Sequence, residues 1–341
     1  MSRKATRSSG LPLMRRLFIM ASSAFATLSL ALLMVGVWGA WSYQGPGPAT
    51  RDGRPAVVML RKGAGLNEIA ASLERADVIR SSAIFIAAAQ MTGGARRLKA
   101  GEYEFPSKAS MARVLADIRA GKTVRHQVTI PEGITSDMVM DILNKEPALT
   151  GEAPTPPEGA VLPETYDFQR GEDRAAVLQR MMDARDRLLA TLWAKRSPGL
   201  PIRTPEEAVI LASIVEKETG VARERPQVAS VFVNRLLKGM RLESDPTIIY
   251  GITKGRPLGR RILLSELQAP TPYNTYAING LPPTPIANPG RASLAAVLDP
   301  PSTDYIFFVA DGSGGHAFAA TYEEHQRNVE AWRAWRARTG K

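Results

Sequence analysis

The sequence predicts an α+β fold with one N-terminal transmembrane helix, a small mixed subdomain and a larger helix-rich domain. Three observations predict it. Residues 17–41 form one long uncharged run, several later segments repeat apolar residues at helical spacing, and short apolar runs between them are typical of strands. The balance of these elements is helix-rich, which favours the α+β class.

The uncharged run from Leu17 to Trp41 is 25 residues long. At about 1.5 Å per residue a helix of this length reaches ~37 Å, enough to cross a hydrocarbon layer of ~30 Å. A cleaved signal sequence, the alternative, has a shorter apolar region of roughly 7–15 residues and ends at a small-residue cleavage site. This run instead ends in Trp38 and Trp41, with Tyr43 close behind, which is typical of an interfacial aromatic belt. We therefore expect a retained transmembrane helix.

The flanking charges predict the orientation of that helix. Five basic residues and no acid precede it, and positive charge is retained on the cytoplasmic side. Residues 1–16 are therefore expected to be a cytoplasmic tail, and the remainder to be periplasmic at the cell inner membrane. The five residues are Arg3, Lys4, Arg7, Arg15 and Arg16.

Composition excludes several classes of function. The chain has no cysteine, so it has neither a disulfide framework nor thiol chemistry. Its three histidines are scattered, and nucleotide-binding, zinc-protease and serine-hydrolase motifs are absent, so we expect no metal and no cofactor. The net charge of +11 favours anionic lipids or an anionic wall polymer, and nucleic acid is not an expected partner outside the membrane.

Residues 44–54 are rich in Gly and Pro and are expected to be a linker. Residues 55–146 are then expected to form a subdomain of short strands and helices. Its first part, strand–helix–helix–strand, resembles the LysM fold, a small module that often binds glycans containing N-acetylglucosamine; a structural spacer of the same shape is the alternative. The expected elements are strands at 57–60, 98–105 and 126–130, and helices at 66–76, 82–91, 111–120 and 137–143.

Residues 147–161 are Pro-rich and are expected to be an extended connector to a domain at 162–338. Residues 241–290 are dense in Pro, Gly, Tyr and Asn, which indicates loops lining a cleft. The remaining expected elements are helices at 175–195, 204–219, 225–239 and 321–336, and a buried strand at 305–310.

The segment LASIVEKETG at 211–220 contains two candidate acids. Counting ~100° per residue along a helix places Glu216 and Glu218 on opposite borders of its apolar arc, with Ser213 and Lys217 on the polar side. A carboxyl at a partly buried edge has a raised pKa, which suits a general acid near neutral pH. Spacing alone does not choose between this role and ion pairing with Lys217, Arg223 or Arg225.

Several blocks in order resemble the endolytic murein transglycosylase (YceG-like) family. They are LASIVEKETG, VASVFVNRLLKGMRLESDPTIIYG, APTPYNTYAINGLPPTPIANPG and YIFFVADGSGGHAF, with weaker matches in LKAGEYEF, IPEGIT and LPETYDF. The resemblance implies cleavage of the β-1,4 bond between N-acetylmuramic acid and N-acetylglucosamine within peptidoglycan, leaving a 1,6-anhydro end. It also implies peptidoglycan synthases as partners, although no residue identifies one.

Family likeness assigns the catalytic acid to Glu218, the second glutamate of E-K-E-T. One carboxyl suffices because the substrate's own 6-hydroxyl is the nucleophile, whereas hydrolysis needs a second carboxyl about 5–9.5 Å away. Asp245 is the candidate for such a group; an Asx turn before Pro246 is the alternative. A non-catalytic wall-binding scaffold that recruits synthases remains the rival function. The expected substrate-binding residues are Glu216, Asp245, Tyr250, Tyr273, Asn274 and Thr275. The polar and aromatic side chains of the loop suit the hydroxyl and acetamido groups and the ring faces of sugars, and an ordinary rigid loop over the core is the alternative.

Overall fold

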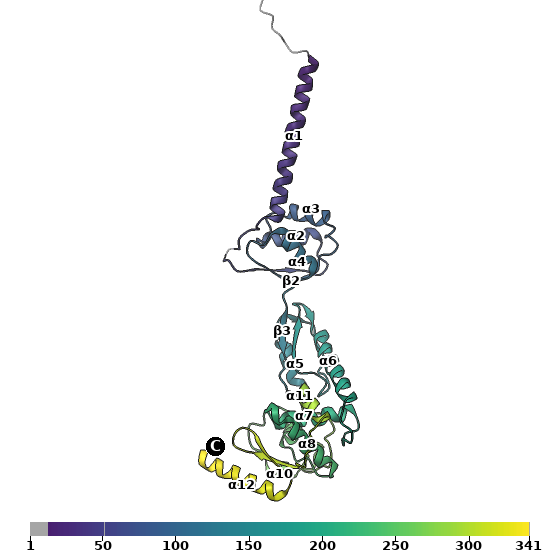
Figure 1. The fold of residues 1–341 in the computed structure, drawn as a ribbon, viewed down its shortest axis with the longest axis vertical. Coiled ribbons are helices and arrows are strands. Elements are labelled where there is room, and N and C mark those ends of the chain that lie inside the picture. Colours follow the sequence, from purple (N-terminus) through teal and green to yellow (C-terminus); the bar gives the residue numbers. More distant parts are fainter. Residues whose placement is uncertain (1–12, 51, 341) are drawn as a thin grey trace, which may run out of the picture. The chain divides into compact units, whose positions relative to one another are not determined.

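The computed structural model describes residues 13–50 and 52–340. The chain divides into two compact units, and the boundary in the sequence lies between Val124 and Arg125. Unit 1 is the N-terminal one and unit 2 the C-terminal one, and each is described by itself (Figure 1). The basic residues Arg3, Lys4 and Arg7 of the expected cytoplasmic tail lie outside the described residues.

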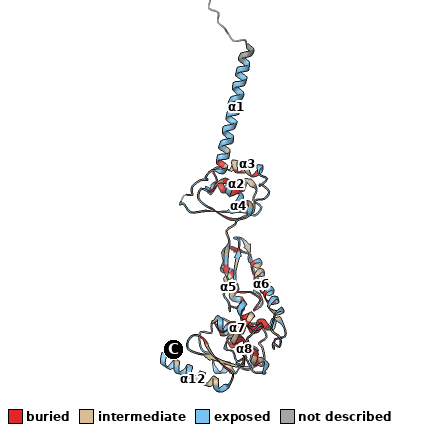
Figure 2. Cartoon of the chain, viewed as in Figure 1, coloured by how far each residue is buried: buried red, intermediate tan, exposed pale blue. Residues whose placement is uncertain are grey.

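Unit 1 begins with α1 (Leu13–Gln44), a single continuous helix. Its apolar part, Leu17–Gln44, is long and apolar enough to cross a membrane, although a signal sequence has the same properties. Nearly every residue of this part is exposed (Figure 2), as expected for a helix whose apolar surface is covered by something other than its own chain.

The rest of unit 1 contains the expected strand–helix–helix–strand arrangement. β1 and β2 pair antiparallel with Val58 opposite Tyr103, and the helices cover one face of this two-stranded sheet. Large side chains that alternate along the strands, such as Leu60 and Phe105, meet Leu73 and Phe85 from the helices in one core. The elements are β1 (Ala56–Leu60), α2 (Leu66–Arg75), α3 (Ser82–Met91), β2 (Gly101–Phe105) and α4 (Met111–Ala120).

Unit 2 starts earlier in the chain than the expected connector at 147–161. β3 pairs antiparallel with β5, and β4 pairs with β6, so residues on both sides of this Pro-rich stretch share one core with α6. The long-range strand pairing is the physical reason that residues 125–161 belong to unit 2. The elements are β3 (His126–Thr129), α5 (Ser136–Lys145), β4 (Leu149–Thr150), β5 (Thr165–Phe168), β6 (Glu172–Asp173) and α6 (Arg174–Ala194).

The centre of unit 2 is α7 (Pro205–Glu218), which packs against α8 (Arg225–Leu237), with the 3-10 turn η1 (Ala222–Glu224) between them, and α11 (Arg291–Leu298). Thr204 caps α7 by accepting the N–H of Glu207 at 3.2 Å. Residues 208–216 of α7 are all buried. Ser213 is therefore not on a polar, exposed side as expected; it donates to the carbonyl of Ile210 and accepts the N–H of Ile286.

Residues 241–290 are not all loop as expected, because they contain α9 (Asp245–Thr253) and α10 (Leu264–Gln268). Pro246 at the start of α9 is a turn signal in sequence but is also well suited to the first turn of a helix. Downstream, β7 (Phe307–Ala310) and β8 (His316–Ala319) form a hairpin that is half-buried rather than buried. The final helix is α12 (Tyr322–Thr339).

Candidate active site

Glu218 is the last residue of α7 and is partly buried. The hydroxyl of Ser244 donates a hydrogen bond to its carboxyl group. Ser244 is itself buried, directly before α9, and its N–H donates to the hydroxyl of Thr275 at 2.9 Å. The end of α7 and the start of α9 are thus joined through one carboxyl–hydroxyl contact.

The surroundings of Glu218 raise its pKa to about 7. Burial is the largest cause, because it disfavours the charged carboxylate, and the nearby charge of Asp245 acts in the same direction. The Ser244 hydrogen bond and the nearby His316 and Arg235 lower the pKa of Glu218 and offset part of this rise. At neutral pH the group is therefore divided between its acid and its carboxylate forms.

Asp245 is exposed at the first turn of α9, and its carboxylate accepts the hydroxyl of Tyr276 at 2.8 Å. Burial, together with the hydrogen bond to Asp245, raises the pKa of Tyr276 and keeps it a donor at neutral pH. The hydrogen bond from Tyr276 therefore holds the Asp245 carboxylate, and its negative charge, in place near Glu218.

Arg235 of α8 holds the segment that leads into Ser244. Its guanidinium donates to the carbonyls of Arg241 and Leu242 at 3.2 and 3.1 Å, and contacts the carboxylate of Glu243 at 3.0 Å. Because this arginine is buried, these contacts fix the backbone on which Ser244 is mounted.

Glu216 lies in a different environment, although it is only two residues from Glu218. Its buried carboxylate accepts from the Arg225 guanidinium at 3.0 Å and from the N–H of Gly290 at 2.8 Å. Arg225 also contacts Glu132 at 2.9 Å. Glu216, expected among the substrate-binding residues, thus joins α7 to α8 and to the start of α11.

Asn274 and Thr275 are fully buried. The Asn274 amide donates to the carbonyls of Glu266, Leu267 and Ala269 at 2.7–3.2 Å, which closes the C-terminal end of α10. Thr275 shares a hydrogen bond of 2.9 Å with Thr247 besides its contact to Ser244. Both side chains hold the loop in place and support Ser244.

Tyr250 and Tyr273 pack against each other with ring centroids 5.0 Å apart, and the ammonium of Lys254 lies within 5.3 Å of both rings. The hydroxyl of Tyr250 contacts Glu158 at 3.2 Å, and that of Tyr273 contacts Thr284 at 2.8 Å. Tyr250 also lines a cavity of about 330 Å³ with Lys217 and Pro246, the chain neighbours of Glu218 and Asp245. Neither Glu218 nor Asp245 itself lines this cavity.

His316 is a further residue of the site that the sequence did not single out. Its ring pairs with Glu224 at 2.9 Å, and the same carboxylate accepts the His316 N–H at 3.3 Å. The signal was present in the family-like block DGSGGHAF, where His316 follows a Gly-rich turn. Among residues 13–50 and 52–340, no three His, Asp or Glu side chains are grouped so that they could hold a metal ion.

Comparison with known proteins identifies relatives along most of the chain. A model described as the YceG-like family matches residues 58–331. The Bacillus subtilis (strain 168) protein named endolytic murein transglycosylase is 27% identical over 319 residues, which cover 84% of this chain and 87% of that protein. The protein of the same name from Streptococcus pneumoniae D39 is 28% identical, and the alignment covers 80% of this chain but only 57% of that protein.

A solved structure is also similar. The crystal structure of a yceG-like protein from Listeria monocytogenes matches with a TM-score of 0.50 and 28% sequence identity. The match covers 80% of this chain and 98% of that one.

Proposed function

Because the chain belongs to the YceG-like family, we propose that it is a membrane-anchored endolytic lytic transglycosylase acting on peptidoglycan. The bond cleaved is the β-1,4 bond between N-acetylmuramic acid and N-acetylglucosamine within a glycan strand. The names of the Bacillus and Streptococcus relatives support this substrate class.

In the proposed reaction Glu218 acts first as the acid and then as the base. Its carboxyl proton passes to the glycosidic oxygen as the bond from that oxygen to the anomeric carbon breaks. The resulting carboxylate then takes the proton of the muramyl 6-hydroxyl while that oxygen bonds to the anomeric carbon. The products are a 1,6-anhydro end and a free 4-hydroxyl, no water is consumed, and Glu218 regains its proton.

The observation that carries this proposal is the position of Glu218, a partly buried carboxyl that accepts the Ser244 hydroxyl. Burial raises the pKa of this carboxyl to about 7. A group that both donates and accepts a proton works best when its pKa is near the working pH. A glutamate with an ordinary pKa of 4.5 would be almost entirely ionised at neutral pH and could not begin the reaction as an acid.

We assign Asp245 a supporting role in place of the water-activating base that hydrolysis would need. Its carboxylate already accepts the Tyr276 hydroxyl, and its negative charge favours the protonated form of Glu218. Ser244 is the positioning residue, because its hydroxyl orients the Glu218 carboxyl toward the substrate bound beside α9.

The helix α1 is the proposed anchor, with the N-terminus cytoplasmic and residues 45–341 in the periplasm. The fold of unit 1 is proposed to be LysM-like, since two helices connect and cover its paired strands β1 and β2. Such a location would confine cleavage to strands close to the bilayer and would limit their length. Peptidoglycan synthases are the partners proposed for the same place.

The test is mass spectrometry of the soluble products released from purified peptidoglycan by the full chain in detergent. The expected products carry 1,6-anhydro ends, and E218Q releases none. E323Q provides a matched control, because Glu323 is an exposed glutamate of α12 and should retain wild-type activity. Reducing ends would identify a hydrolase, and glycan binding without any cleavage would identify the wall-binding scaffold.

A further inference from the structure

The outward face of α3 in unit 1 carries no charge and is mostly apolar, which is unusual for a helix on the surface of a protein. No residue of α3 is charged. Phe85 and Ala89 face the core, whereas Ala83, Ala87 and Met91 are exposed, Met91 to 87%, and Gln90 is the one exposed polar residue of the helix. A surface helix normally places polar and charged residues on its outer face, so this face matches an apolar environment better than water.

This helix lies at the point where α1 ends. α1 contacts both α3 and α4, and Tyr43 packs against the core of unit 1. Arg80, just before α3, lies over the ring of Trp41 with its guanidinium 5.6 Å from the centroid. Figure 1 shows α3 beside the C-terminal end of α1. If α1 crosses a bilayer, α3 is therefore held at the level of the lipid headgroups.

The segment between α1 and β1 is fixed to the rest of unit 1 and is not a free linker. Arg80 donates to the carbonyls of Pro46 and Gly47 at 3.3 and 3.4 Å. The backbone of Lys108 accepts the N–H of Gly47 at 3.2 Å and donates to the carbonyl of Pro48 at 3.0 Å. These contacts fix the direction in which α3 faces relative to the axis of α1.

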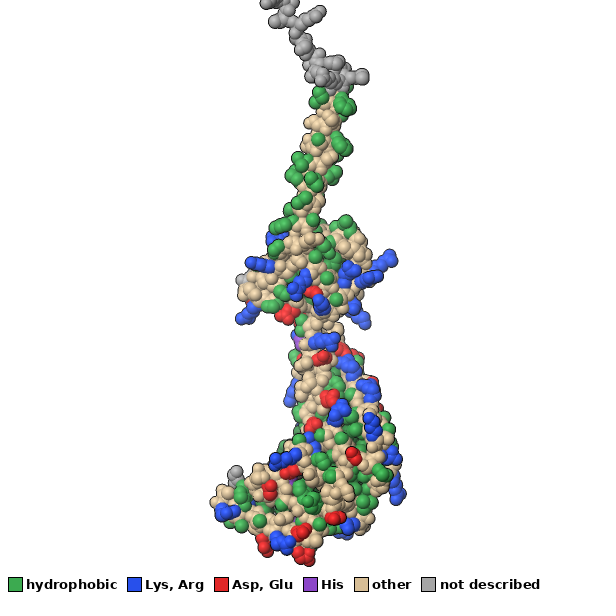
Figure 3. All heavy atoms as spheres, viewed as in Figure 1, with side chains coloured by type: hydrophobic (Ala, Val, Ile, Leu, Met, Phe, Trp, Pro, Cys, Tyr) green, Lys and Arg blue, Asp and Glu red, His purple; other side chains and the backbone are tan. Residues whose placement is uncertain are grey.

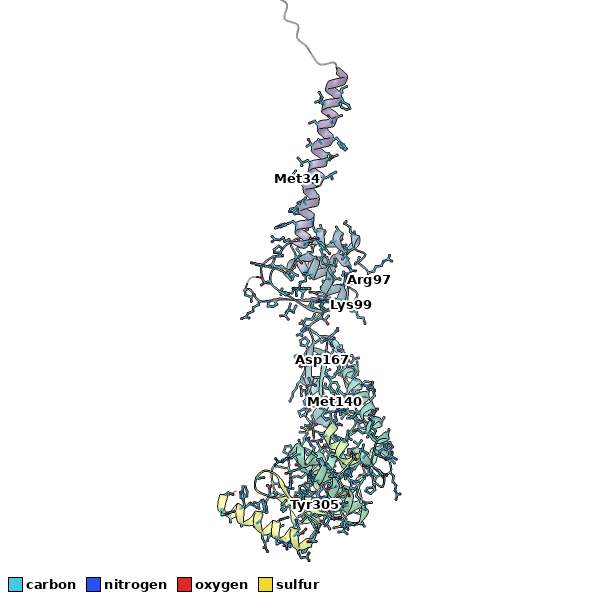
Figure 4. The ribbon with its side chains drawn as sticks, viewed as in Figure 1. Met34, Arg97, Lys99, Met140, Asp167 and Tyr305 are labelled. Atoms are coloured by element: carbon cyan, nitrogen blue, oxygen red, sulfur yellow. The ribbon has the colours of Figure 1, made fainter. Side chains whose placement is uncertain are left out.

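The positive charge that follows α1 is confined to the same unit. Residues 45–124 contain 13 Lys and Arg against 7 Asp and Glu, whereas residues 125–341 contain 26 of each kind. Arg96, Arg97 and Lys99 are exposed just beyond α3, and Figure 4 labels two of them. Within residues 13–50 and 52–340, neither Arg96 nor Arg97 forms an ion pair with an acidic side chain. Figure 3 shows basic side chains around unit 1.

We propose that α3 docks onto the outer surface of the bilayer, with anionic phospholipids as its partner. Ala83, Ala87 and Met91 face the boundary between headgroups and acyl chains, and the basic residues beyond α3 attract the lipid phosphates. The inference depends on the anchoring by α1 in the proposed function. It makes unit 1 a fixed base on the membrane, so that only the chain beyond Val124 sets how far from the bilayer cleavage occurs.

The absence of cysteine allows a direct test with one label at a time on the full chain. M91C, V57C and L28C are each labelled with an environment-sensitive fluorophore and reconstituted into nanodiscs. Val57 is the matched control, since it is an apolar residue of unit 1 that is 58% exposed on β1. Leu28, in the middle of α1, reports insertion of the anchor. The discs contain phosphatidylcholine alone or with phosphatidylglycerol, and their acyl chains are brominated to quench a buried label.

We expect the label at residue 28 to be quenched in all discs. In the anionic discs the label at residue 91 should be quenched at least twofold more than the label at residue 57, and R96E/R97E should reduce that quenching without affecting residue 28. Equal, weak quenching at residues 91 and 57 with strong quenching at residue 28 would overturn the docking of α3 alone. Absence of quenching at residue 28 would overturn the anchor and the docking together, while cleavage of purified peptidoglycan would still test Glu218 separately.

Discussion

Glu216 and Glu218 are separated by a single residue at the end of α7, but the regions around them differ in one respect that decides their chemistry. The region around Glu216 supplies a guanidinium and a backbone N–H, which satisfy the carboxylate in its charged form. The region around Glu218 supplies burial and a neighbouring negative charge, which favour the neutral form and outweigh the opposite effect of the Ser244 hydroxyl. A buried carboxyl that is paired with a cation stays in its charged form. A buried carboxyl without such a partner has a raised pKa, which is the property that a general acid needs.

The largest expected effect is on catalysis, and it distinguishes the two regions most strongly. E218Q should lower kcat on peptidoglycan by about 10²–10⁴-fold, the usual contribution of a general acid–base group, while the fold stays intact. The measurement is the rate of anhydro-product release, with circular dichroism to verify folding. A variant that retains wild-type kcat would show that the difference between the two regions has no catalytic meaning.

Removal of the Glu216 carboxylate should lower the free energy of unfolding. E216A leaves Arg225 without its buried acidic partner, and breaking such a buried pair costs about 3 kcal/mol. Denaturant unfolding of the full chain in detergent measures this loss. The matched variant E132A removes the second, more exposed partner of Arg225 and should cost less than about 1 kcal/mol. Equal losses for the two variants would contradict the role given to Glu216.

The pH dependence of stability should show the raised pKa of Glu218 independently of activity. The carboxyl has a pKa near 4.5 when unfolded and about 7 when folded, so the folded state binds more protons between these values. Wild-type protein should therefore lose stability relative to E218Q as the pH rises from about 4.5 to about 7, by about 1–3 kcal/mol in all. Thermal unfolding of both proteins at pH 5 and pH 8 measures it, and an unchanged difference between the two pH values would contradict the account.

The smallest expected effects are two opposite shifts of the pH–rate profile. S244A removes a hydrogen bond that lowers the pKa of Glu218, so the alkaline limb of kcat/KM should move to higher pH. D245N removes a negative charge that raises this pKa, so the limb should move to lower pH. Each shift is expected to be below about one pH unit. Movement of both limbs in the same direction would refute the assignment of these two neighbours.

The sequence predicted the local elements of unit 1 well because they depend on residues near one another. The helices α3 and α4 begin and end as expected, and β1 differs by one residue. Hydrophobic periodicity is sufficient there, since each helix buries one face against a single small sheet. The same reasoning did not find the unit boundary at Val124, because that depends on β3 pairing with β5, about forty residues later in the chain.

For the candidate site, helical spacing singled out Glu216 and Glu218 but could not distinguish them, and the apolar arc it predicted is wrong, because residues 208–216 are buried on every side of α7. The distinction comes from Arg225, Gly290 and Ser244, which lie on other elements and are brought close only by the fold. The loop residues Asn274 and Thr275 were expected to contact substrate because polar side chains suit sugars. Their burial could not be foreseen, since it depends on α9 and α10, two short helices within a segment expected to be loop.

The most direct test of the central claim is a titration of Glu218 itself. The carboxyl signals of glutamate side chains can be followed by ¹³C NMR from pH 4 to pH 9 in wild-type protein, with E218Q to assign the signal that disappears. The account predicts that this one signal titrates near pH 7, well above the ordinary glutamate value of 4.5. A Glu218 signal that titrates near 4.5, and so is ionised throughout the neutral range, would contradict it.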